Sequence, residues 1–130
     1  MKRMTNIDEY MSVLQNSFIL ILMAKDDLEI VTSTDLLSKL ETVSEKYTKY
    51  DFYIADIENL MDVAEAFGLF DAPILLAISK GEVLDADECG YYDRFSASTG
   101  EEVFNLTNLP DRLDEFVENI EQTLYNLSNK

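Results

Sequence analysis

The chain has 130 residues, a length that suits one domain spanning 1–130 around a single hydrophobic core. Hydrophobic residues make up 47% of it and only two prolines and four glycines occur, which excludes a disordered or collagen-like chain. With 26 acidic and 10 basic residues the formal net charge is -16, so the surface repels phosphate backbones and anionic lipids. Neither nucleic acid nor a membrane is therefore an expected partner.

The first two predicted elements are a helix and a buried strand. Thr5 is the expected N-cap of a first helix of about ten residues, because apolar residues recur after it at i, i+3, i+4 and i+7. These residues are Ile7, Tyr10, Met11 and Leu14. The apolar run that follows, 17–23, is typical of a strand covered on both faces and is expected in the middle of a sheet.

A strand and two helices are predicted next, after a polar loop at 25–29. Thr32, Ser33 or Thr34 can cap a second helix, and 51–56 is a short aromatic and β-branched strand. A third helix ends at Gly68. The apolar faces of the two helices are Leu36, Leu40, Val43 and Tyr47 in one, and Leu60, Val63, Ala64 and Phe67 in the other. Such alternation of strands and helices favours parallel strands.

The last third of the chain predicts a hairpin and a long helix. A strand at 74–78 follows Pro73, and the Lys80-Gly81 turn joins it to an antiparallel strand at 82–84, so the sheet is mixed. Residues 91–106 are expected to form a second hairpin or an ordered loop. The final helix starts at Pro110 and is expected to pack on the sheet. Its apolar face consists of Leu113, Phe116, Val117, Ile120 and Leu124.

The residues that usually carry metal or thiol chemistry are scarce. The chain has no histidine and one cysteine, Cys89, so no intramolecular disulfide and no Cys/His metal site are expected. Two acidic clusters lack the glycine and the distal glutamate of a calcium loop, and we interpret them as solvated loops. The clusters are Asp26, Asp27 and Glu29, and Asp85, Asp87 and Glu88. No cofactor, metal or catalytic acid–base pair is predicted.

The localisation expected from the sequence is the cytoplasm. The N-terminus is basic at Lys2 and Arg3 but continues into polar residues, so it lacks the apolar core of a signal peptide. The longest apolar run, 18–24, is too short to span a bilayer. The acidic, cysteine-poor composition fits a bacterial cytoplasm.

From residue 18 to about residue 90 the sequence resembles the thioredoxin family. The matching segments are 40–47 (LETVSEKY), 54–56 (IAD), 64–69 (AEAFGL), 72–75 (APIL) and 80–83 (KGEV). The resemblance implies a thioredoxin-like α/β fold with a mixed central β-sheet flanked by helices, and with an extra hairpin or loop before the C-terminal helix. It covers roughly half of the chain and is specific for the fold rather than for an activity.

The paired cysteines of that family are missing. The resemblance aligns the C-x-x-C motif with Ile30, Val31, Thr32 and Ser33. Dithiol exchange needs an exposed thiolate to attack and a second thiol to resolve the mixed disulfide, so a dithiol oxidoreductase is not expected. The acid that the family buries on its central strand also has no counterpart in 18–24.

What the family would retain is a binding face. The resemblance implies a cis peptide bond before Pro73, beside which a bound peptide pairs with the backbone of the preceding residue, and it places the Cys89-Gly90 pair near the same groove. The predicted face comprises Asp71, Ala72, Pro73, Cys89 and Gly90. We therefore expect a redox-inactive protein that binds a protein or peptide as an accessory or folding-helper module.

Two alternatives stay open at this point. A single thiol at Cys89 could form mixed disulfides in a monothiol redox protein, although a lone cysteine is more often a buried apolar residue and the neighbouring acids would raise its pKa. A structural homodimer is the other alternative.

Overall fold

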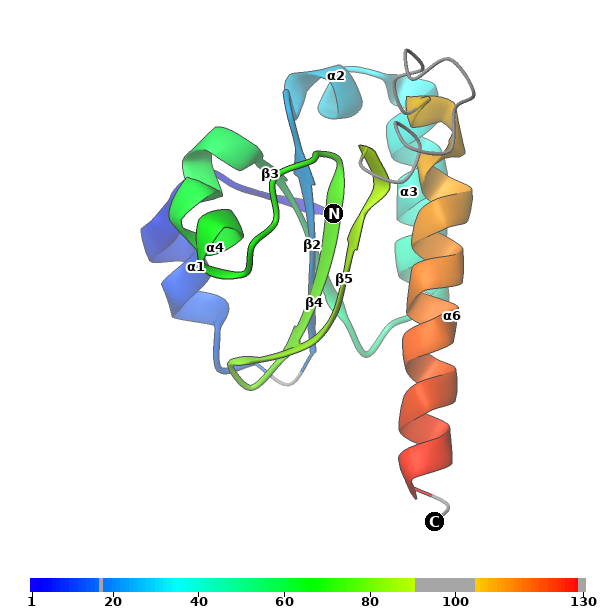
Figure 1. Cartoon of the computed structure of the whole chain (residues 1–130). Coiled ribbons are helices and arrows are strands. Elements are labelled where there is room, and N and C mark those ends of the chain that lie inside the picture. The colour runs from blue at the N-terminus through cyan, green and yellow to red at the C-terminus, as the bar shows by residue number, and fades with distance from the viewer. Residues whose placement is uncertain (17, 91–104, 129–130) are drawn as a thin grey trace, which may run out of the picture.

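The computed structural model describes residues 1–16, 18–90 and 105–128, and within them five strands form one mixed sheet (Figure 1). The strands are β1 (Lys2–Met4), β2 (Ile19–Ala24), β3 (Asp51–Asp56), β4 (Ile74–Ser79) and β5 (Glu82–Glu88), in the spatial order β1-β3-β2-β4-β5. The first three run parallel, whereas β4 is antiparallel to β2 and β5 is antiparallel to β4. The mixed sheet predicted from the sequence is confirmed.

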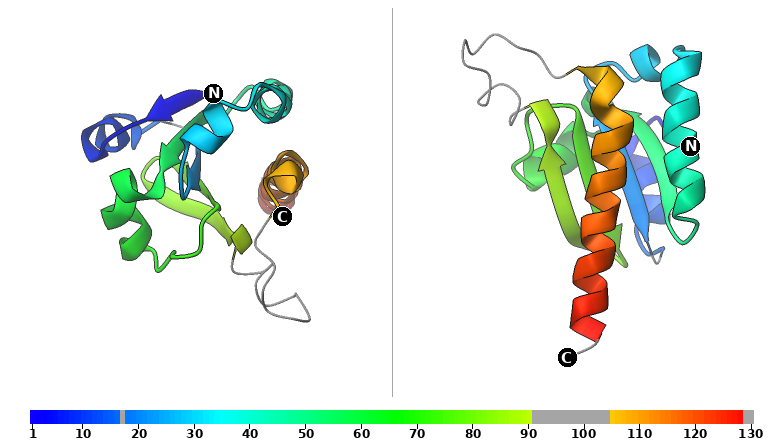
Figure 2. Two further views of the ribbon diagram at one scale, coloured as in Figure 1. Left: turned by 90° about the horizontal axis from the view of Figure 1, so that it is seen from above. Right: turned by 90° about the vertical axis from the view of Figure 1, so that its right-hand side faces the viewer.

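Helices cover both faces of this sheet. On one face lie α3 (Thr34–Lys46) and α6 (Leu109–Ser128), and on the other lie α1 (Ile7–Val13), the 3-10 helix η1 (Ile57–Leu60) and α4 (Met61–Ala66) (Figure 2). The short helix α2 (Leu28–Val31) follows β2, and the 3-10 turn η2 (Leu106–Asn108) precedes α6. Among the described residues, no helix combines the length and apolar composition needed to cross a bilayer.

The apolar runs of the central strands produce two cores. In β2 every residue is buried, with Leu20 and Leu22 facing α3 and α6 while Ile21 and Met23 face α1 and α4. Since successive side chains of a strand point to opposite faces, a strand covered on both sides must be apolar throughout. This explains why the continuous apolar run lies mid-sheet, as predicted; Ser17, at its start, lies outside the described residues.

Two expectations about the first half of the chain are wrong, and one strand was not predicted. The cap of α1 is Asn6 rather than Thr5, because the Asn6 side chain accepts a hydrogen bond from the Glu9 N–H. The basic N-terminal residues form β1, which pairs with β3 at the edge of the sheet. The end of the expected polar loop is helical, because α2 starts at Leu28.

The predicted helix faces hold with two exceptions, Met11 and Phe67; Met11, predicted on the buried face of the first helix, is 59% exposed. Ser33 caps α3, and its side chain accepts a hydrogen bond from the Leu36 N–H. Phe67, predicted on the buried face of the third helix, is instead 42% exposed, because α4 ends at Ala66 and the chain turns at Gly68 with a φ of 69°.

The second half follows the predicted order. Lys80 and Gly81 have positive φ values of 50° and 83°, as a tight hairpin turn between β4 and β5 requires. The strand β5 runs to Glu88, beyond the predicted 82–84. The predicted hairpin or loop at 91–106 lies mostly outside the described residues, and Leu106 begins η2. The final helix and its buried face are confirmed.

Candidate binding site at one end of the sheet

The predicted face lies at the end of the sheet where β2 leaves for α2 (Figure 1). In the sheet register, Ile74 at the start of β4 lies opposite both Met23 near the end of β2 and Glu88 at the end of β5. The residues on either side of these positions, Pro73 and Cys89, therefore lie at the same end of the sheet.

The segment before β4 is held in place by hydrogen bonds from β5. The Ala72–Pro73 peptide bond is cis, the isomer that the resemblance implies. One carboxylate oxygen of Glu88 accepts from the backbone N–H groups of Phe70 and Asp71, at 3.1 and 3.0 Å. The Cys89 N–H donates to the Pro73 carbonyl oxygen at 3.0 Å. Both sides of the cis bond are thus fixed to β5 and the residue that follows it.

Gly90 makes a close backbone approach possible. A Cβ atom at this position would lie 2.4 Å from the carbonyl oxygen of Ala72 and 3.4 Å from that of Asp71. The first distance is shorter than any van der Waals contact, so only glycine fits without a shift of the backbone. The structure therefore brings Asp71, Ala72, Pro73, Cys89 and Gly90 together.

Ala72, which precedes the cis bond, has no backbone hydrogen bond within the described residues, since neither its N–H nor its carbonyl oxygen has a partner there. The residue is half-buried, and two positions earlier the side chain of Phe70 is 66% exposed. An extended peptide that pairs with a strand end uses backbone N–H and C=O groups that, like those of Ala72 within the described residues, have no other partner.

The positions aligned with the missing dithiol have structural roles. The side chain of Ile30 is fully buried in the core that also contains Cys89, and Val31 packs against that core. The Thr32 hydroxyl donates to the Leu28 carbonyl oxygen, and Ser33 caps α3. Ile30 and Cys89 therefore share a core, whereas the Thr32 and Ser33 side chains bond within their own helical segments.

The thiol of Cys89 is enclosed. Its residue exposure is 0%, and its Sγ lies 4.0 Å from the carbonyl oxygen of Asp87. A thiol that water does not reach is a poor nucleophile, because the thiolate form needs solvation or a nearby positive charge.

A buried carboxylate near this end of the sheet was missed. Asp27, interpreted from the sequence as solvated, is 2% exposed, and its Oδ2 accepts from Nε of Arg3 at 3.0 Å and lies 2.9 Å from a terminal guanidinium nitrogen of that residue. Carboxylate oxygens of Asp26 and Asp56 lie within 4.8 Å of it and of each other. In the sequence, Arg3 is the residue that could have indicated an ion-pair partner for Asp27. Its position beside Asp27 follows only from the pairing of β1 with the sheet.

The second acidic cluster is also only partly solvated. Asp85 is exposed, as predicted, but Asp87 forms an ion pair with Arg112 of α6 and Glu88 holds the segment before Pro73. The closely spaced acids, interpreted from the sequence as a solvated loop, lie on the edge strand β5. Because successive side chains of a strand point to opposite faces, Asp87 points toward α6 and Glu88 toward the other face.

Solved structures with a similar fold include several thioredoxins. Residues covering 88% of this chain superpose on 98% of a thioredoxin from Fasciola hepatica, with a TM-score of 0.55 and 12% identity. The oxidised thioredoxin of Plasmodium falciparum aligns over 88% of this chain and 96% of its own, with a TM-score of 0.58 and 16% identity. Mitochondrial thioredoxin 3 of Saccharomyces cerevisiae gives 0.56 and 14%, over 88% and 94%.

Sequence comparison finds no match: no protein-family model and no curated protein matches the chain. At identities this low the structural likeness establishes the fold alone. The chain has a thioredoxin-like fold, as the resemblance implied, with one cysteine where dithiol chemistry requires two.

Proposed function

We propose that this chain is a redox-inactive thioredoxin-like protein that binds an extended segment of a protein or peptide at the cis-proline face. The observation that carries the proposal is the backbone of Ala72, whose N–H and C=O have no partner among the described residues although the segment around them is fixed. A fixed segment loses little conformational freedom when a ligand binds, and so contributes more of its contact energy to affinity.

The surroundings of Ala72 support binding rather than exchange of disulfides. The exposed Phe70 ring supplies an apolar contact beside the unpaired groups. Ile30 and Ser33, aligned with the two cysteines, carry no sulfur, and the thiol of Cys89 is buried. The monothiol alternative needs that thiol to become accessible, and nothing in the geometry of the described residues favours it.

Binding is tested with peptides selected against the purified protein from a displayed library. We expect the backbone amide signals of residues 70–72 to shift in a ¹⁵N-edited titration with the selected peptide. The substitution Phe70→Ser should weaken binding about tenfold, because it removes the exposed ring that the peptide would cover. Met11→Ser is the matched control, since Met11 is also largely exposed, at 59% compared with 66%, and lies on α1. A selected peptide whose affinity is the same for both variants would contradict the proposal.

The thiol is tested separately by intact mass after timed exposure to oxidised glutathione across a pH series. We expect Cys89 to stay unmodified until the protein is denatured. Rapid formation of the glutathione adduct in the folded protein would instead establish the monothiol function.

A further inference from the structure

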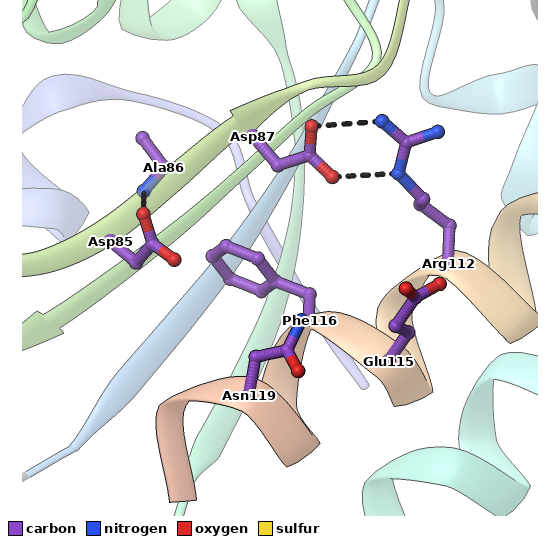
Figure 3. Close-up of a pocket in the computed structure, with 7 residues that line it drawn as sticks. All are labelled: Asp85, Ala86, Asp87, Arg112, Glu115, Phe116 and Asn119. Atoms are coloured by element: carbon purple, nitrogen blue, oxygen red, sulfur yellow. Dashed lines mark hydrogen bonds and ion pairs between the residues drawn. The ribbon is translucent and has the colours of Figure 1, made fainter. Parts of the chain in front are cut away.

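A second surface lies between β5 and α6. An apolar cavity of about 170 Å³ is lined by Val83, Leu84, Ile120 and Leu127, among others. A polar cavity of about 460 Å³ adjoins it, lined by Asp85, Asp87, Arg112 and Glu115 together with three more residues (Figure 3). Both cavities lie between β5 and α6 and share Asp85 in their lining, and we refer to the two together as the groove.

The groove borders an open strand edge. β5 is the last strand of the sheet, and within the described residues it pairs only with β4. The register with β4 is irregular between the Ile78–Val83 and Ala77–Asp85 pairs, and the Ala86 N–H donates to the Asp85 carboxylate. The outer edge of β5 is otherwise unpaired within the described residues, and β-strand addition at such an edge is a common way of binding extended peptides.

The charges of the groove determine which partner fits. Four of the seven residues of β5 are acidic. The Asp87 carboxylate is paired with Arg112 through contacts of 2.7 and 3.0 Å. Among the described residues, Asp85 accepts a hydrogen bond from the N–H of Ala86 alone, and Glu115 forms no ion pair. The groove therefore has two carboxylates that a basic ligand can reach.

The same charges disfavour a second copy of this chain. Pairing two β5 strands edge to edge would place the acidic residues of both copies opposite one another, and like charges in that position are destabilising. Acidic residues on an edge strand prevent such self-association, whereas a basic strand would meet opposite charges.

We propose that the groove between β5 and α6 binds a basic, extended segment of a partner protein as an added antiparallel strand. Lysine or arginine side chains of the segment pair with Asp85 and Glu115, and apolar side chains two residues apart enter the hollow beside Val83 and Leu127. This surface does not depend on the cis-proline face.

The probe is a fluorescein-labelled peptide of sequence Thr-Lys-Thr-Lys-Thr-Val-Thr-Val, whose antiparallel alignment puts lysine at the acidic end of the groove and valine at the apolar end. The control peptide has glutamate in place of both lysines. Binding is followed by fluorescence anisotropy at low salt, and we expect the lysine peptide to bind and the glutamate peptide not to bind.

Two pairs of variants test the location. The double substitution Asp85→Lys with Glu115→Lys should weaken binding of the lysine peptide about tenfold, since two charge pairs become repulsive. Glu45→Lys with Glu65→Lys changes the net charge equally at exposed positions of α3 and α4 and should leave affinity unchanged. Leu127→Asp should also weaken binding, whereas Met11→Asp, at the same 59% exposure, should not.

Several results would overturn the proposal. The first two are equal binding of both peptides and no binding of either. The third is an equal loss of affinity for the lysine peptide in the two charge-reversal proteins, because that result would mean that the peptide responds only to the net charge of the protein. Sedimentation of the unmodified chain provides a further check: a dimer that Leu127→Asp disrupts would identify a second copy as the occupant. Thermal melts followed by circular dichroism verify that each variant is folded. If the charge-reversal variants do not fold, the comparison of Leu127→Asp with Met11→Asp tests the proposal instead. Loss of peptide binding in Phe70→Ser bears only on the proposed function.

Discussion

The ion pair between Arg3 and Asp27 supports a sharp prediction about stability. Substituting Arg3→Ala leaves a carboxylate that is 2% exposed without its cation, beside Asp26 and Asp56 within 4.8 Å. Removing one partner of a buried pair costs about 3 to 5 kcal/mol. The Arg3 side chain is 44% exposed, so water replaces part of the guanidinium contact, and we expect a loss of about 2 kcal/mol in the free energy of unfolding.

Repulsion among the three carboxylates contributes to this loss. Two unit charges 4.8 Å apart repel by about 1 kcal/mol in water and about 3 kcal/mol at the effective dielectric constant near a protein surface. Because salt screens the exposed members of the cluster, 0.5 M NaCl should restore part of the stability of Arg3→Ala. Asp27→Asn in the Arg3→Ala background should restore part as well, since it removes the uncompensated charge.

The assay is urea denaturation followed by circular dichroism at pH 7. Lys2→Ala is the control, since Lys2 is the adjacent exposed residue of β1 and forms no ion pair with the described residues. If the free energies of unfolding of Arg3→Ala and Lys2→Ala agree within about 0.5 kcal/mol, the reasoning about the buried pair is wrong.

Two other substitutions test the packing and the titration of the fold. Gly90→Ala places a Cβ 2.4 Å from the Ala72 carbonyl oxygen, so we expect a loss of about 2 kcal/mol in urea unfolding and weaker binding of the selected peptide; unchanged stability would contradict the close approach. The Tyr50 hydroxyl is buried without a hydrogen-bond partner among the described residues, and burial, with the nearby Glu121 charge, raises its pKa above the usual value. The folded state therefore holds this proton after the unfolded state releases it, and the resulting stability, present below about pH 10, is lost as the pH rises further. Tyr50→Phe should raise stability at pH 7 by about 1 kcal/mol and reduce this alkaline loss, as pH-dependent urea melts would reveal.

Much of the fold could be predicted from the sequence because its central strands carry an unambiguous pattern. A run with no polar residue, such as β2, can only be covered on both faces, and the Lys80-Gly81 turn permits only a tight hairpin. The edge strand β1 could not be found in this way. It has three residues, two of them exposed, and what defines it is its pairing with β3 rather than any local preference.

The candidate site was predictable to the extent that it depends on backbone geometry. The segment before Pro73 and the glycine at 90 could be placed through the resemblance, and the structure brings them together. The side chains that hold this segment were not predictable, because Glu88 and Asp27 look the same in sequence as their solvated neighbours. Their roles depend on which face of a strand or which end of a helix each one occupies.

Asp27 and Glu88, one from each acidic cluster, lie near the end of the sheet at which a dithiol protein of this fold carries its cysteines. Here the carboxylates near the end of the sheet have structural partners: Asp27 has a guanidinium, and Glu88 has two backbone N–H groups. Groups already paired in this way are poorly suited to relay protons, since each transfer would break a bond that holds the fold. The Glu88 carboxylate also holds the segment before Pro73 in place. In the proposed function, a segment held in this way lowers the entropic cost of binding an extended chain.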